Sequence, residues 1–290
     1  MNLHLIDGTY ELFRHYYGAP PKKSPDGREV GATVGLLRSL VMLLGQPATT
    51  HLACAFDHVI ESFRNKLYSG YKTEEGIEPD LFKQFHLAEE AVSDLGVVVW
   101  PMVEFEADDA LATGAALFRD ARGVDQVLIC SPDKDLAQSV RGKKVVCWDR
   151  RRDIVLDEDG VVKKFGVRPG SMPDWLALVG DSADGYPGIK GWGAKSASVV
   201  LSRFGHLEKI PHDHRQWEVK VRAAERLSES LESNRDDAML FRTLATLRED
   251  VPLKENLEDL EWRGAHGRLK QLCRDLGDEE LLERITSWRT

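Results

Sequence analysis

The sequence predicts an α/β protein in which a mostly parallel sheet, flanked by helices, is followed by a helical region. In the first half of the chain, several short runs are apolar on both faces, as is typical of strands buried between helices. Helix-like segments separate the first four of these runs, and this alternation indicates a parallel sheet. From about residue 170 onward, helical periodicity replaces the strand pattern.

The individual elements follow from local patterns. The predicted strands are the apolar runs at 3–7, 51–57, 96–100, 126–130 and 144–148, and the predicted helices between the first four are 31–44, 80–95 and 107–119. Residues 69–80, "SGYKTEEGIEPD", combine Gly, Pro and acids, so we expect a mobile loop or arch there. We therefore predict an α/β domain at 1–170, with the arch near 69–90, and a helical region at 171–290.

The composition suits a globular protein with one large or two modest domains, since 42% of the 290 residues are hydrophobic and 30% are charged. No apolar run approaches the ~18 residues that a membrane span needs, and the start "MNLHLIDGTY" does not have the pattern of a secretory signal. We expect no membrane partner. Four scattered cysteines without zinc-like spacing indicate reduced thiols in a cytoplasmic protein.

The net charge of −9, from 39 Lys and Arg against 48 Asp and Glu, argues at first sight against a nucleic-acid partner. The objection weakens if the acids are concentrated in a cluster that metal ions neutralise. Removing nine acids would leave 39, which balances the basic residues. The rest of the surface would then be free to carry a basic track.

Nine carboxylates recur where predicted strands end or are followed by a turn or helix. Carboxyl ends of parallel strands share one edge of a sheet, which is where ligands of such sheets bind. Acids from four sections of the first half are expected there, together with the two that open "VGDSADGYPGIKGWGAKSA". The set is Asp7, Asp57, Glu106, Asp108, Asp109, Asp133, Asp135, Asp181 and Asp184.

Each acid has an ordinary alternative explanation when taken alone. Asp–Gly at 7–8 is a turn signal, the acids at 106–109 favour a helix N-terminus, and "DKD" suits a solvated loop. Their joint preference for one edge has no such explanation. Divalent cations with oxygen ligands would relieve the repulsion, and carboxylates without His or Cys suit Mg²⁺ or Mn²⁺ rather than zinc.

This pattern suits two-metal hydrolysis of a phosphodiester, in which a nearby cation completes the electrostatics. Arg64 and Lys72 in "SFRNKLYSGYK" are the candidates, although spacing alone favours an ordinary solvated basic face. A second candidate feature is "PGIKGWGAKSA", where convergent backbone N–H groups and a following helix could hold a phosphate. Its predicted DNA-binding residues are Gly188, Lys190, Gly191, Gly193 and Lys195, and the alternative is a turn with only a packing role.

The motifs as a set resemble the 5′ nuclease family of flap endonucleases and 5′–3′ exonucleases, which includes the N-terminal domain of bacterial DNA polymerase I. The matching pieces, in family order up to about residue 205, are "LIDGTYELFR", "AFD", "SFRNKLYSGYK", "FEADDALA", "SPDKDLAQ" and "VGDSADGYPGIKGWGAKSA". The resemblance implies a PIN-like nuclease domain and a helix–three-turn–helix module at about 174–205. It also implies that the loop near 69–90 is a gateway for the 5′ strand.

Carried over onto this chain, the resemblance assigns the nine acids to a site for two or three Mg²⁺ or Mn²⁺ ions. It places Arg64 and Lys72 near the scissile phosphate and assigns residues 188–195 to duplex binding, with K⁺ held by backbone carbonyls. The implied substrate is DNA with a 5′ end, flap or nick, and we expect a monomer. Because the chain stops at Thr290, with no room for a polymerase domain, we also expect a stand-alone nuclease.

The chain departs from the family pattern at three points. Ala183-Asp184-Gly185 replaces the usual Ser-Asp-Asn, "SPDKD" replaces "TADKD", and Phe13 replaces a frequent tyrosine. None of these changes removes a carboxylate, so only the positioning of the substrate is put in question.

Three other functions are less consistent with the sequence. "IDGT" suggests a haloacid-dehalogenase-type phosphatase, but that chemistry needs an aspartate where this chain has Leu5. A PIN-type ribonuclease would share the acids but has no reason to carry the Gly-Lys hairpin. A non-catalytic DNA-junction binder has no reason to keep the complete acid set.

Overall fold

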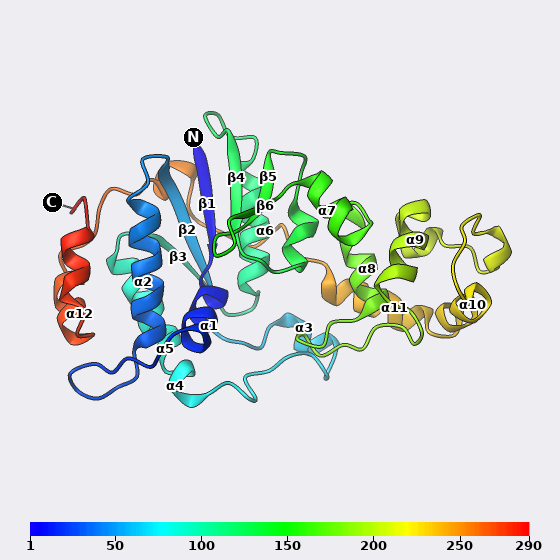
Figure 1. Cartoon of the computed structure of the whole chain (residues 1–290), viewed down its shortest axis with the longest axis horizontal. Coiled ribbons are helices and arrows are strands. Elements are labelled where there is room, and N and C mark those ends of the chain that lie inside the picture. Colours follow the sequence, from blue (N-terminus) through cyan, green and yellow to red (C-terminus); the bar gives the residue numbers. More distant parts are fainter. Residues whose placement is uncertain (290) are drawn as a thin grey trace. The chain divides into compact units, whose positions relative to one another are not determined.

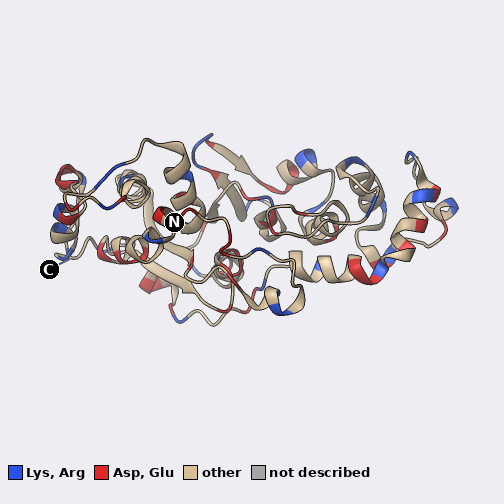
Figure 2. Cartoon of the chain, turned by 90° about the horizontal axis from the view of Figure 1, so that it is seen from below, with Lys and Arg blue, Asp and Glu red and all other residues tan. Residues whose placement is uncertain are grey.

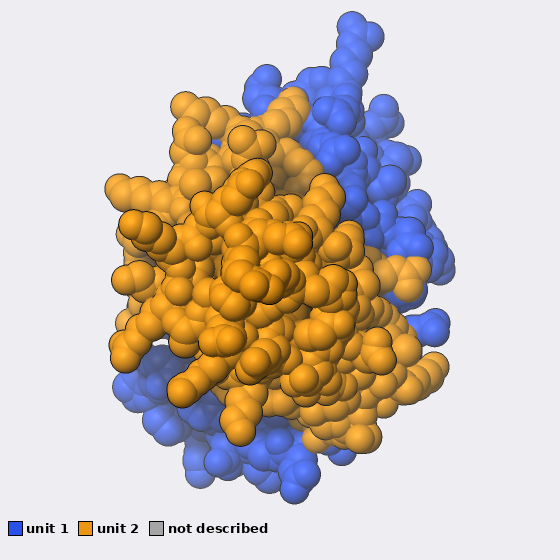
Figure 3. Space-filling model, turned by 90° about the vertical axis from the view of Figure 1, so that its right-hand side faces the viewer, with its two compact units in different colours: residues 1–60, 74–131, 249–290 blue, residues 61–73, 132–248 orange. Residues whose placement is uncertain are grey.

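The computed structural model describes residues 1–289 of the chain (Figure 1). The backbone forms two compact units, each made of separate stretches of sequence and coloured separately in Figure 3. The first unit contains residues 1–60, 74–131 and the chain from 249 onward, and the second contains 61–73 and 132–248. These units reflect packing and not chain order, so the predicted domain boundary at residue 170 stays a prediction.

The first unit is built on a parallel sheet with strand order β3-β2-β1-β4. Its strands are β1 (Asn2–Asp7), β2 (Thr49–Asp57), β3 (Val98–Met102) and β4 (Gln126–Cys130). From β1 the chain adds β2 and then β3 on one side, and it returns to the other side of β1 as β4. The strand order therefore reverses between β1 and β4, where open parallel sheets bind ligands.

Helices cover both faces of this sheet, which explains why its strands are apolar throughout. Helices α1, α2 and α5 pack together on one face, and α6 packs against the other (Figure 1). The helices of this unit are α1 (Gly8–Gly18), α2 (Gly31–Leu44), α4 (Pro79–Phe82), α5 (Gln84–Asp94), α6 (Ala107–Phe118) and α12 (Leu269–Asp275), with 3₁₀ turns at Leu257–Leu260 and Glu279–Arg284. The mostly parallel, helix-flanked sheet predicted from the sequence is confirmed.

The single helix predicted over 80–95 is interrupted at Lys83, between α4 and α5. The Gln84 side chain donates to the Asp80 carbonyl at 3.0 Å and accepts from the Thr33 amide at 3.1 Å. A side chain that bonds to the local backbone competes with the regular helical pattern. The Gln84 side chain therefore bonds to a backbone carbonyl at the interruption and connects this segment to α2.

The second unit is mainly helical, as predicted for the later part of the chain. It contains one antiparallel hairpin, β5 (Val145–Asp149) and β6 (Ile154–Leu156), and β6 escaped the sequence analysis because it is short and its Ile154 and Val155 are exposed. Its helices are α3 (Phe63–Leu67), α7 (Glu158–Phe165), α8 (Met172–Val179), α9 (Ala194–Phe204), α10 (Ala224–Ser233) and α11 (Arg235–Ala245), with 3₁₀ turns at Asp135–Ser139, Pro169–Ser171, Leu207–Lys209 and His214–Gln216. Within residues 1–289, no helix combines the length and the apolar character needed to cross a membrane.

Candidate active site and nucleic-acid interface

Asp7 occupies the point where the strand order of the first unit reverses. Ile6 pairs with Cys130, the last residue of β4, so the residues that follow this pair, Asp7 and Ser131, come together. Asp7 Oδ2 accepts a hydrogen bond from Ser131 Oγ at 2.8 Å, and Oδ1 accepts from the Tyr10 amide at 2.8 Å and caps α1. The side chain is held rigidly at the carboxyl end of the sheet.

Three further acids of the first unit are tied together at the start of α6. Asp57, the last residue of β2, accepts from the Ala107 amide at 2.8 Å, and the Glu106 amide donates to Asp109 Oδ2 at 3.0 Å. The helix-capping explanation for Glu106 and Asp109 is therefore correct locally. Both acids are nevertheless buried, as is Asp57, whereas Asp108 is half-buried on the same turn.

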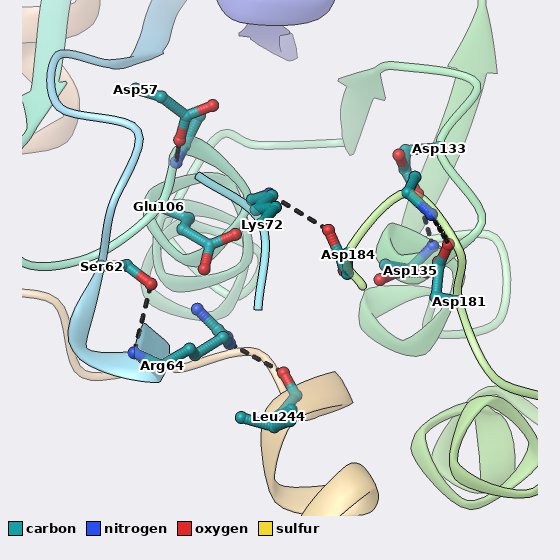
Figure 4. A network of polar contacts seen from close by, with 12 residues as sticks. Asp57, Ser62, Arg64, Lys72, Glu106, Asp133, Asp135, Asp181, Asp184 and Leu244 are labelled. Atoms are coloured by element: carbon teal, nitrogen blue, oxygen red, sulfur yellow. Dashed lines mark hydrogen bonds and ion pairs between the residues drawn. The ribbon is translucent and has the colours of Figure 1, made fainter. Parts of the chain in front are cut away.

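The second unit brings together the other four predicted acids (Figure 4). One oxygen from each of Asp135, Asp181 and Asp184 lies within 4.8 Å of the other two. The Asp135 amide donates to Asp133 Oδ1 at 2.9 Å, which holds the fourth acid beside them. Paired backbone hydrogen bonds between Asp181 and Tyr186, at 2.9 and 3.0 Å, form the turn that carries Asp184.

This second cluster has an excess of negative charge. Burial, followed by the charges of Asp133 and Asp184, raises the pKa of Asp135 well above its ordinary value. Asp135 Oδ1 is buried and has no hydrogen-bond partner among residues 1–289. Oxygen-only ligands with an incompletely satisfied buried carboxylate fit a divalent cation such as Mg²⁺ or Mn²⁺.

Lys134 is a functional candidate that the sequence analysis missed, although its place between Asp133 and Asp135 was a signal. Its Nζ contacts Asp181 Oδ2 and lies 3.7 Å from Asp135 Oδ1. Burial lowers the pKa of Lys134, but the carboxylates of Asp135 and Asp181 outweigh it and raise the pKa above its ordinary value. Lys134 therefore stays charged and offsets part of the repulsion.

Lys72 lies directly beside this cluster. Its Nζ is 3.3 Å from Asp184 Oδ1, and its amide donates to the Asp184 carbonyl at 3.0 Å (Figure 4). Next to Asp184, the backbone at position 185 passes close to the Gly70 carbonyl oxygen. This approach requires glycine, because Gly185 has φ of +87° and a Cβ there would lie 2.1 Å from that oxygen.

Arg64, the other predicted catalytic cation, is 1% exposed. Its Nε donates to the Leu244 carbonyl at 2.7 Å (Figure 4). Its Nη2 donates to the Thr246 carbonyl at 3.1 Å. These bonds satisfy carbonyls at the end of α11, so Arg64 has a packing role and is not the solvated basic residue that spacing alone favoured. Its contact with a scissile phosphate stays a prediction.

The predicted DNA-binding hairpin joins α8 to α9, and its glycines differ in role. Gly188 has φ of +69° and a Cβ there would lie 2.4 Å from the Gly180 amide nitrogen, so this glycine serves packing within the chain. Gly191 also has a positive φ, of +87°, whereas Gly193 is extended and borders open space. Lys190 and Lys195 are exposed. The DNA-binding role of these five residues stays a prediction.

A cavity of about 590 Å³ lies against this hairpin. Gly191, Gly193 and Lys195 line one part of it, and Lys220 and Arg222 line another. The last two cations were missed because "KVRAAER" was interpreted only as part of a helix, although its alternating basic residues were visible. The cavity therefore presents cations from two separate segments.

The two units differ strongly in charge. The second unit has 24 Lys and Arg against 19 Asp and Glu, a formal charge of +5, and the first has 15 against 29, a formal charge of −14. Figure 2 shows basic residues on the helices of the second unit, interspersed with acids. The net charge of −9 is thus the sum of an acidic first unit and a basic second unit. The basic unit is suited to contact with phosphates.

Comparison with known families gives two adjoining matches. The model of the N-terminal resolvase-like domain of 5′–3′ exonucleases matches residues 2–166, and that of their C-terminal SAM fold matches residues 167–268. The chain belongs to the 5′–3′ exonuclease family. It is accordingly a 5′ nuclease, an enzyme that hydrolyses phosphodiester bonds.

Individual relatives agree with this assignment. A 5′–3′ exonuclease of Aquifex aeolicus is 33% identical over 98% of this chain and 94% of its own length. DNA polymerase I of Rhizobium leguminosarum is 37% identical over 89% of this chain, which spans only 26% of that protein. In many relatives this nuclease region is thus a minor part of a polymerase.

Solved structures of low sequence identity share the fold. The T5 D15 protein co-crystallized with metal ions has a TM-score of 0.68 at 17% identity, with 84% of this chain and 89% of that chain covered. The catalytic core of Rad2 in complex with DNA has a TM-score of 0.59 at 18% identity, with 97% and 92% covered. The PIN-like nuclease fold expected from the motifs agrees with both likenesses.

Proposed function

We propose that this 5′ nuclease acts on DNA at 5′ ends, flaps or nicks and uses two or three Mg²⁺ or Mn²⁺ ions. The nine predicted acids are the proposed metal-site residues. The observation that carries the proposal is the convergence of Asp135, Asp181 and Asp184, with one buried Asp135 oxygen lacking a hydrogen-bond partner. When bound, divalent ions activate water and stabilise the leaving oxygen of a phosphodiester.

The chain's own residues position the substrate. Lys72, held beside Asp184, is placed to attract the oxygens of the scissile phosphate. Lys195, Lys220 and Arg222 around the cavity would contact backbone phosphates without reading bases. K⁺ bound by backbone carbonyls of the hairpin 188–195 is part of the proposal, as is a cytoplasmic location in which the four buried thiols stay reduced.

The function is tested with duplexes that carry a labelled 5′ flap, a nick or a 3′ flap of the same sequence. We expect cleavage of the 5′ flap and at the nick with Mg²⁺ or Mn²⁺, and none in a chelator. The 3′ flap is the matched control. Equal cleavage of both flaps, or cleavage without a divalent metal, would contradict the proposal.

The cavity cations are tested separately by duplex binding. Replacing Lys195 or Lys220 by alanine should lower the slope of log K against log[salt] by about 1, because each phosphate contact contributes about 0.9 to that slope. Binding is measured by fluorescence anisotropy in Ca²⁺ at several salt concentrations. Lys163→Ala, which removes an exposed lysine of α7 outside the cavity, is the control. An unchanged slope in both cavity variants would rule out the assigned role.

A further inference from the structure

Two histidines and a glutamate of the first unit form a cluster that differs in composition from the carboxylate-only clusters. His58 directly follows β2, whereas His86 and Glu89 lie three residues apart on α5 and therefore on one side of that helix. The Nδ1 atom of His58 is 2.8 Å from Glu89 Oε2, and the Nδ1 atom of His86 is 3.9 Å from the same oxygen. One possible ligand atom from each residue lies within 4.8 Å of the other two.

These separations suit a small tetrahedral metal ion. Zn²⁺ bonds of ~2.0–2.2 Å to nitrogen and oxygen place neighbouring ligand atoms roughly 3.3 Å apart. The two distances to Glu89 Oε2, 2.8 and 3.9 Å, bracket that value. The imidazole rings lie beside each other with centroids 4.4 Å apart and planes inclined by 56°, so both can direct a nitrogen toward the carboxylate.

An ordinary ion pair explains only part of this arrangement. A histidine and a glutamate also meet at His212 and Glu232, but among residues 1–289 no third metal-ligating side chain joins that pair. At Glu89 a second histidine approaches the oxygen that His58 already contacts. The Glu89 side chain is 12% exposed and that of His86 is 68% exposed, so an ion can enter from solvent and retain water as a fourth ligand.

The ligand types distinguish this cluster from the proposed nuclease site. Two imidazoles and one carboxylate favour Zn²⁺, whereas carboxylates alone favour Mg²⁺. We propose that His58, His86 and Glu89 bind one Zn²⁺ ion. The ion connects α5 to the residue that follows β2, immediately after Asp57. This link stabilises the first unit against unfolding.

The proposal is tested by calorimetric titration of the full chain with Zn²⁺, after metal removal and in millimolar Mg²⁺. Because Mg²⁺ occupies the oxygen-only sites in every variant, differences in Zn²⁺ binding between variants report on the imidazole site. We expect one equivalent of Zn²⁺ to bind to the wild type and His86→Ala to weaken that binding at least about tenfold. His212→Ala, which disrupts the pair without a third ligand, should bind as the wild type does.

Two further measurements keep the test independent of folding and of nuclease activity. Zn²⁺ should raise the melting temperature of the wild type but not that of His86→Ala, whose altered side chain is exposed and not needed for the core. Co²⁺ in place of Zn²⁺ should give tetrahedral visible absorption that Glu89→Gln reduces. Equal Zn²⁺ affinity in wild type and His86→Ala, or no Zn²⁺ binding in Mg²⁺, would overturn the site.

Discussion

Asp181→Ala is expected to lower the cleavage rate of a 5′ flap at least about 10³-fold while the protein remains folded. Asp181 is one of the three acids whose oxygens converge in the second unit, and Asp135 in the same cluster is already disfavoured as an anion. Without Asp181 the remaining acids hold a divalent ion less tightly. The rate is measured in single turnover at saturating Mg²⁺.

We expect the Asp181→Ala variant to remain folded, because the substitution has opposing effects on the free energy of unfolding. Asp181 Oδ1 accepts from the Ala183 amide at 3.0 Å and Oδ2 contacts Lys134 Nζ, and alanine removes both interactions. Its charge also raises the pKa of Asp135, so removing it relieves repulsion in the metal-free protein. Asp133→Ala should lose activity similarly, whereas Asp159→Ala, which removes an exposed acid of α7, should not.

The design of this test separates catalysis from folding. Asp181→Asn retains an oxygen that can accept from Ala183 but removes the charge. It should therefore be as inactive as the alanine variant and at least as stable in a chelator. A variant at position 181 that cleaves at the wild-type rate would remove the proposed metal site.

Arg64→Ala is expected to destabilise the protein by about 1–3 kcal/mol, since the carbonyl of the buried residue Leu244 loses its charged donor. The carbonyl of Thr246, an exposed residue, loses a second bond that water can replace. The melting temperature should fall by about 2–4 °C for each kcal/mol. Thermal unfolding of the metal-free protein measures the effect. Lys66→Ala, on the same short helix but exposed, should change the melting temperature little.

The same variant distinguishes the packing role of Arg64 from its predicted catalytic role. Cleavage is compared well below the melting temperature, where both proteins are folded. A purely packing residue would leave the rate of flap cleavage near that of the wild type, whereas a phosphate-binding residue would lower it. An unchanged melting temperature would contradict the packing role that the burial of Arg64 indicates.

The elements of the sheet were predictable because their signals are local. The buried strands are continuous apolar runs, and the positions of Asp7 and Asp57 at strand ends follow directly from where those runs stop. The start of α6 at Ala107 was likewise visible in the acids at its N-cap and in its first turn. The family resemblance then implied a metal-binding role for these acids, which the periodicity of the apolar residues cannot indicate.

The environment of a charged side chain was not predictable in this way. Arg64 lies in a short polar stretch that looks solvent-exposed, yet it is buried by the end of α11, 180 residues away in the chain. Gly188 looked suited to contact a ligand, yet its conformation is required by close packing against Gly180. Lys220 and Arg222 joined the hairpin cavity only because the chain between α9 and α10 folds back toward it.

The sequence by itself determined the buried strands of the first unit, the set of candidate acids and the nuclease family, because these depend on residues close together in the chain or on recognisable motifs. Only the tertiary structure decided which cations are buried, which glycines serve packing, and that two histidines meet Glu89. Those properties depend on contacts between segments far apart in sequence. Burial and proximity arise from packing, and local composition does not encode them.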